Sequence, residues 1–248
     1  MKKRADLEIC CSNWESAKIA DAAGADRIEI CSGLDEGGLT PSLGLIIQCT
    51  QLSLKTHVLI RVRSGDFLYA KDEIEIMKKD VVFCRENGVD GVVFGFLKSN
   101  GHIDEKLTKE FVELAHPMKT TFHRAFDMCK DPFQALDQLI SLNLDYLLTS
   151  GQQSTALEGA SLIQQLVKKA NNKISIMAGS GVRVKLLTEL IQKSDADAYH
   201  LSARIKNHSK MKFKNNRLNM GSNSVDSEYI IHTQDIDELK KALEILKK

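Results

Sequence analysis

Eight short apolar runs along this chain each end in polar, thiol, imidazole or glycine residues, and each is followed by a helical stretch. The runs lie at residues 7–9, 28–30, 58–62, 92–94, 120–122, 146–148, 174–177 and 199–201. A strand and a helix repeated eight times are typical of a (β/α)₈ barrel, whose active site lies where the strands end. The sequence therefore predicts an α/β fold of the TIM-barrel type and directs the search for function to the residues that follow the strands.

The size of the chain fits one such barrel. With 248 residues and no linker rich in glycine, serine and proline before residue 204, we expect a single domain. The barrel should span residues 1–204, and residues 205–248 should add a basic loop at 206–217 and a C-terminal helix. The apolar stripe of that helix predicts packing on the barrel or on a second copy in a homo-oligomer.

Composition narrows the class of protein. A net charge of +1 argues against a protein whose main partner is nucleic acid. No apolar run approaches the roughly 18 residues of a membrane span, and no secretory signal follows the basic N-terminus. We therefore expect a cytoplasmic protein without a membrane partner, whose six cysteines are reduced thiols.

The two-residue alternation of strands predicts which side chains enter the barrel. The apolar residues of each strand must face the helices, so the polar residues between them must face inward. This places six ionisable groups in the upper interior, and Cys10 and Cys31 lie close by. The six are Glu8, Glu29, Arg61, Arg63, His123 and His200.

Two interpretations of these charges remain open. Buried charges are costly unless they are paired, so the cluster is either an ion-pair network that fills the mouth or a binding site for a small anionic molecule. In the second case the arginines would hold carboxylate or phosphate, and Glu8, Glu29 and His123 could transfer protons. We also expect Arg61 and Glu29 to lie close enough to pair.

Glycine-containing turns support the anion interpretation. Ser150 and Gly151 follow the sixth run, and Gly179, Ser180 and Gly181 follow the seventh. Backbone N–H groups in such turns can bind phosphate, and TIM barrels often bind phosphate near the seventh and eighth strands. The alternative explanation is that these residues only form tight turns.

The thiols favour a different ligand. Cys10 and Cys31 should lie on adjacent strands and on one face, about 5 Å apart. Two soft thiolates at this distance suit Cu(I), although two reduced thiols could also simply line a pocket.

Several segments resemble the CutC family over residues 5–204. They are LEIC at 7–10, GADRIEIC at 24–31, EGGLTPS at 36–42, RVRSGDF at 61–67, TFHRAFDM at 121–128, LTSGQ at 148–152 and MAGSGV at 177–182. The resemblance implies a TIM barrel, a cytoplasmic location and copper as the bound ion. Together with the spacing of the thiols it makes Cys10 and Cys31 the expected ligands of Cu(I), with His123 or His200 as a supplementary ligand. Copper homeostasis is therefore the first functional hypothesis. The second is an enzyme for a small, phosphorylated metabolite, and whether the protein is an enzyme at all stays open.

Overall fold

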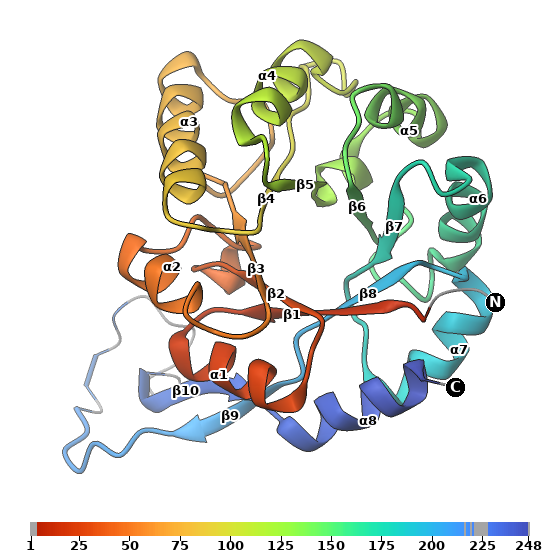
Figure 1. Cartoon of the computed structure of the whole chain (residues 1–248). Coiled ribbons are helices and arrows are strands. Elements are labelled where there is room, and N and C mark those ends of the chain that lie inside the picture. The colour runs from red at the N-terminus through yellow and green to blue at the C-terminus, as the bar shows by residue number, and fades with distance from the viewer. Residues whose placement is uncertain (1–3, 216, 219, 221–227, 248) are drawn as a thin grey trace.

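The computed structural model describes residues 4–215, 217–218, 220 and 228–247, and within them eight parallel strands close into a barrel (Figure 1). The barrel strands are β1 (Asp6–Cys11), β2 (Arg27–Ile30), β3 (Lys55–Leu59), β4 (Gly91–Phe94), β5 (Lys119–Phe122), β6 (Tyr146–Thr149), β7 (Ser175–Ala178) and β8 (Ala198–Leu201). The strands follow one another around the barrel in chain order, and β8 pairs with β1 to close it. The predicted TIM-barrel fold is confirmed.

Helices surround the barrel, and most of them follow a strand directly in the chain (Figure 1). They are α1 (Trp14–Ala23), α2 (Leu43–Cys49), α3 (Lys71–Glu86), α4 (Glu105–Ala115), α5 (Pro132–Ser141), α6 (Ala160–Ala170), α7 (Val184–Ser194) and α8 (Ile236–Leu246). Two short 3₁₀ helices, η1 (Leu34–Glu36) and η2 (Arg124–Met128), lie in the loops after β2 and β5. Within the described residues no helix is long and apolar enough to cross a bilayer.

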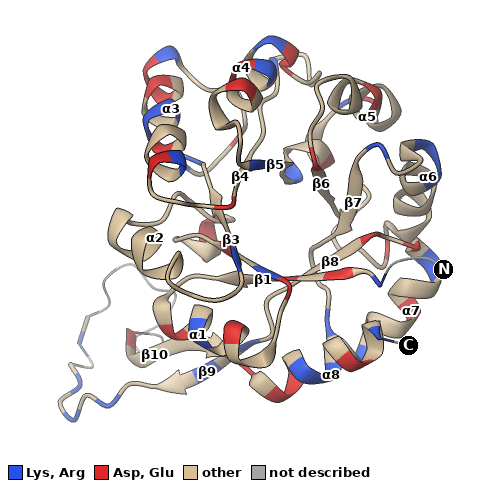
Figure 2. Ribbon diagram, viewed as in Figure 1, with Lys and Arg blue, Asp and Glu red and all other residues tan. Residues whose placement is uncertain are grey.

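The core lies between the strands and the helix layer. Outward-facing strand residues such as Leu7, Ile9, Ile28 and Ile30 are completely buried there. Apolar burial of this kind is the main force that holds helices on a sheet. Lysine, arginine, aspartate and glutamate are interspersed over the outer surface of the helices, so neither sign of charge dominates a helix layer (Figure 2).

The C-terminal segment contains more regular structure than the sequence indicated. After β8 the chain forms a two-stranded antiparallel sheet from β9 (Arg204–His208) and β10 (Ile230–Gln234). The expectation of a loop beginning at residue 206 is therefore corrected, because residues 206–208 pair with β10. Residue 216 of the predicted loop lies outside the described residues.

The sheet and the last helix are attached to the start of the barrel. Gln234 donates a hydrogen bond from Nε2 to the Cys10 carbonyl over 2.8 Å, and Asn13 donates to the His232 carbonyl over 2.9 Å. Helix α8 contacts α1 and α7, and its Leu239 and Leu243 are buried. The apolar stripe of α8 thus lies between the first and seventh helices, and it completes the helical ring.

Candidate functional site

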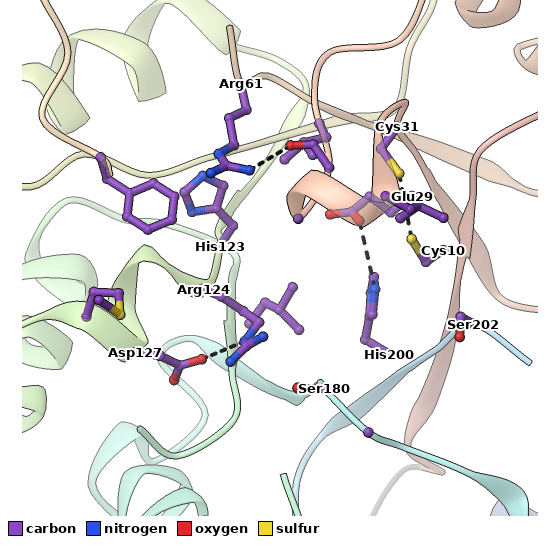
Figure 3. Close-up of a pocket in the computed structure, with 18 of the residues that line it drawn as sticks. Cys10, Glu29, Cys31, Arg61, His123, Arg124, Asp127, Ser180, His200 and Ser202 are labelled. Atoms are coloured by element: carbon purple, nitrogen blue, oxygen red, sulfur yellow. Dashed lines mark hydrogen bonds and ion pairs between the residues drawn. The ribbon is translucent and has the colours of Figure 1, made fainter. Parts of the chain in front are cut away.

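A cavity of about 1130 Å³ opens where the barrel strands end. Residues from the strand ends and from the loops that follow them line it, including Cys10, Glu29, Cys31, Arg61, His123 and His200. Figure 3 shows two groups in this mouth, with the thiols, Glu29 and His200 on one side and Arg61, His123, Arg124 and Asp127 on the other. The first group comes from β1, from β2 and the residue just after it, and from β8, and these three strands are neighbours in the barrel.

The two thiols lie closer together than strand spacing alone requires. Cys10 Sγ and Cys31 Sγ are 3.7 Å apart, and both side chains are buried. Cys10 pairs in register with Glu29 rather than with Cys31, so Cys31 reaches across from the residue just beyond β2. The hydrogen bond with Cys31, followed by burial, raises the pKa of Cys10 well above its ordinary value. Cys10 is therefore a thiol at neutral pH in the free protein, and a metal would have to displace its proton.

His200 connects these thiols to the interior of the barrel. Its Nδ1 lies 2.7 Å from Glu8 Oε1, and its Nε2 lies 3.8 Å from Glu29 Oε2. Ligand atoms of Cys10, Glu29 and His200 all lie within 4.8 Å of one another. Since the Glu8 carboxylate accepts from Nδ1–H, the other ring nitrogen of His200 is directed at the cluster of possible metal ligands.

The charges of these groups depend on one another. Burial raises the pKa of Glu29 to about 7, although the His200 charge opposes this effect. Burial alone would lower the pKa of His200, but hydrogen bonds to Cys10 and Glu8 and the nearby carboxylates raise it well above its ordinary value. His200 is thus an imidazolium between two carboxyl groups, and it must release the Nε2 proton before it can bind a metal.

Below this cluster, Glu8 belongs to a buried network that the sequence analysis only partly foresaw. Arg27 donates from Nε to Glu8 Oε2 over 2.5 Å, and its guanidinium lies 4.1 Å from the centre of the Tyr146 ring. His57 Nδ1 lies 4.0 Å from the same carboxylate oxygen. Burial would raise the pKa of Glu8, but Arg27, His200 and His57 hold it far below its ordinary value. Glu8 is therefore an ionised carboxylate that orients His200.

Arg27 and His57 are members of this buried network that the sequence analysis missed. The alternation that placed Glu29 inside the barrel also places Arg27 inside, two residues earlier, and the in-register pairing of His57 with Glu29 extends the inward row to β3. The two-residue alternation of β2 and β3 therefore predicts both residues in the layer of the barrel below the thiols.

The expected pair of Arg61 and Glu29 does not form, and this prediction was wrong. Arg61 Nη1 donates to the carbonyls of Glu36 and Gly38, and Nη2 donates to the carbonyl of Gly65, each over 2.9 Å. Arg61 lies beyond the end of β3, where the loops before and after it supply nearby carbonyl groups. It therefore faces the cavity without a carboxylate partner among the described residues.

The expected position of Arg63 is also corrected, because its guanidinium does not line the cavity. It forms ion pairs with Glu73 over 2.6 Å and Asp66 over 3.1 Å, and it donates to the Leu68 carbonyl over 2.8 Å. These contacts hold the loop between β3 and α3 in place, and residues 65–68 of that loop line the cavity.

His123 follows β5 and lines the cavity as expected. Its Nδ1 accepts a hydrogen bond from the Ala125 N–H over 3.2 Å, whereas its buried Nε2 has no hydrogen-bond partner within the part of the chain that the structure describes. Gly95 leaves room for this ring, since a Cβ there would lie 2.5 Å from Nδ1. Burial, followed by the charge of Arg61, lowers the pKa of His123 to about 3, so the ring is neutral.

The glycine-containing turns separate into two kinds. Ser180 and Gly181 line the cavity, but Ser150, Gly151 and Gly179 do not. Asp127 accepts hydrogen bonds from the backbone N–H and the hydroxyl of Ser150. The turn after β6 therefore fastens η2 to the barrel, and of these two turns it is the one after β7 that faces the cavity.

The chain is similar to proteins of one family. Residues 5–205 match the model of the CutC family. The chain is 44% identical to the mouse copper homeostasis protein cutC homolog over 235 residues, which cover 94% of this chain and 86% of the mouse protein. It is 45% identical to the CutC family protein of Parabacteroides distasonis over 236 residues, which cover 94% and 97% of the two chains.

Solved structures agree with this similarity. The crystal structure of CutC from Streptococcus agalactiae superposes with a TM-score of 0.75 and 32% identity, covering 79% of this chain and 97% of that chain. Phosphoribosylanthranilate isomerase from Thermotoga maritima superposes with a TM-score of 0.58 at 11% identity, which shows the shared barrel fold alone.

Proposed function

Because the chain belongs to the CutC family of copper homeostasis proteins, we propose that it is a cytoplasmic protein that binds Cu(I) as its cargo at the mouth of the barrel. The observation that carries this proposal is the pair of buried sulfur atoms of Cys10 and Cys31, 3.7 Å apart at the cavity wall. Soft thiolates are the ligands that Cu(I) prefers.

The spacing of the sulfur atoms fits a single ion. Metal–thiolate bonds of about 2.3 Å can together span up to about 4.6 Å, so two sulfurs at the observed distance can share one ion with a bent arrangement. A bent arrangement leaves a position for a third donor. His200 is the best candidate, since Glu8 holds its ring and its Nε2 faces the cluster.

The proposal is tested by competition with a Cu(I) chelator under reducing conditions. The wild type should bind one Cu(I), and Cys10→Ser with Cys31→Ser should lose this binding. The matched control is Cys49→Ser with Cys84→Ser, because these buried thiols belong to α2 and α3 and do not line the cavity. Equal copper binding by the first double variant and the wild type would show that Cys10 and Cys31 are not the copper ligands.

The structure offers less to the enzyme hypothesis. Arg63, Ser150, Gly151 and Gly179 were expected to hold a phosphorylated substrate, and none of them lines the cavity. Glu8 is completely buried and already bonded to Arg27 and His200, which leaves it no access to a substrate proton. We therefore propose binding rather than catalysis.

A further inference from the structure

The charge of Arg61 is not balanced by any carboxylate among the described residues. Its side chain is buried, three of its hydrogen bonds go to backbone carbonyls, and its remaining neighbour of hydrogen-bonding character among the described residues is the uncharged hydroxyl of Tyr69. A buried cation without a counter-charge is costly, and carbonyl dipoles offset only part of that cost. Arg61 nevertheless lines the cavity instead of pointing to bulk water.

Hydrogen-bond donors around Arg61 also lack acceptors. A guanidinium carries five N–H donors, and three of them donate to backbone carbonyls here. Of the others, the Nε–H is buried and has no hydrogen-bond partner among the described residues. The ring of Phe67 lies between two such groups, 5.2 Å from the Arg61 guanidinium and 5.0 Å from the His123 ring. The Nε2 of His123 also has no hydrogen-bond partner among the described residues.

The protonation state of His123 makes this nitrogen a donor as well. Nδ1 accepts from the Ala125 N–H, so a neutral ring must carry its proton on Nε2. This side of the mouth therefore presents one cation and two unused N–H groups, and the described residues supply no acceptor for them. Buried polar groups are normally paired, so an acceptor supplied by a ligand is the simplest completion.

The shape of the cavity indicates what kind of ligand carries the acceptor. A volume of about 1130 Å³ is far more than one copper ion occupies and lies slightly above the range of about 300–1,000 Å³ that is usual for organic ligands. The wall includes the apolar side chains of Phe67, Leu97, Leu148 and Val182. An organic molecule with one anionic group would satisfy both features, because the anion meets Arg61 and the body meets the apolar wall.

We propose that the mouth contains a second site, centred on Arg61 and His123, that binds a small organic oxyanion. It faces the thiol pair across the cavity (Figure 3), and it does not depend on copper binding. Carboxylate and phosphate share the required chemistry, and a guanidinium recognises either group.

The test uses the full chain in its metal-free form. Phenyl phosphate and benzoate serve as organic probes, inorganic phosphate tests whether the head group suffices, and benzyl alcohol tests whether the ring suffices. Calorimetric titration should show saturable binding of at least one organic anion and much weaker binding of benzyl alcohol. The preferred anion then identifies the head group. No saturable binding of either organic anion at millimolar concentration would overturn the proposal.

A matched pair of variants locates the site. Arg61→Gln should weaken binding by about tenfold or more, since a charge-assisted hydrogen bond is lost. Arg63→Gln should retain binding, because Arg63 follows the same strand but lies outside the cavity. Undiminished binding by a folded Arg61→Gln variant would refute the assignment.

Two further measurements test the site independently of the Arg61→Gln variant and of copper binding. If Arg61→Gln fails to fold, the ¹⁵Nε–¹H resonance of Arg61 in the wild type should shift on titration with the bound probe, and an unmoved resonance would contradict the site. The double variant Cys10→Ser, Cys31→Ser should still bind the anion. Its behaviour separates this proposal from the copper proposal, because loss of copper binding alone leaves the oxyanion site intact.

Discussion

Replacing Arg27 with methionine tests whether the buried network is a structural requirement of the barrel. Arg27 and Glu8 are 3% and 0% exposed, so solvent cannot take the place of either partner. The variant keeps a long side chain but leaves the Glu8 carboxylate with His200 as its main partner. It also removes the stacking of the guanidinium on Tyr146.

The expected loss is about 3–5 kcal/mol of the free energy of unfolding, which is the usual cost of breaking one side of a buried ion pair. Marginal stabilities of about 5–15 kcal/mol make this a large fraction of the total. Urea unfolding with an unchanged m-value is the assay. The double variant Arg27→Met, Glu8→Gln should lose less than the sum of the two single variants, because no carboxylate is then stranded.

Lys193→Met is the control for loss of a salt bridge as such. Lys193 pairs with Glu189 over 2.7 Å, but both side chains are largely exposed, so no measurable change is expected. A loss below about 1 kcal/mol for Arg27→Met would refute the reasoning, since it would show that Glu8 is neutralised or solvated in the native protein.

Three further predictions concern acid stability, backbone conformation and copper. Burial lowers the pKa of His57 to about 4, below the ordinary 6.5, so the free energy of unfolding should fall as pH drops from about 6.5 towards 4. In urea unfolding, His57→Leu should reduce the loss of stability between pH 7 and pH 5 by up to about 2 kcal/mol, and an unchanged loss would contradict a neutral buried ring. Gly38→Ala should lower the free energy of unfolding by about 1–2 kcal/mol in the same assay, because Gly38 has a φ of +90° and an added Cβ would lie 2.7 Å from Leu59 Cδ2. Gly44→Ala is the control, since the space around Gly44 is open and no destabilisation is expected; equal effects of the two variants would argue against this explanation. His200→Asn should weaken Cu(I) binding by about tenfold or more in chelator competition without abolishing it, and unchanged affinity would show that His200 is not a third ligand.

The periodicity of the sequence determined the barrel and the inward direction of the side chains on β1 and β2 at its mouth. Alternation within short strands fixes the direction of each side chain, because neighbouring residues must point to opposite faces. Glu8, Cys10 and Glu29 therefore lie inside the barrel as predicted, and Cys31 joins them one residue beyond β2.

Only the tertiary structure decided the partners of residues beyond the strand ends. Arg61 and Arg63 are two residues apart, yet the side chain of Arg61 lines the cavity and that of Arg63 only fastens the loop between β3 and α3. Alternation stops where the strand stops, and a long arginine side chain then follows whichever carbonyl or carboxylate groups the loops bring near it. Those groups come from segments as far apart as Glu36 and Glu73, and their positions depend on how the whole barrel packs.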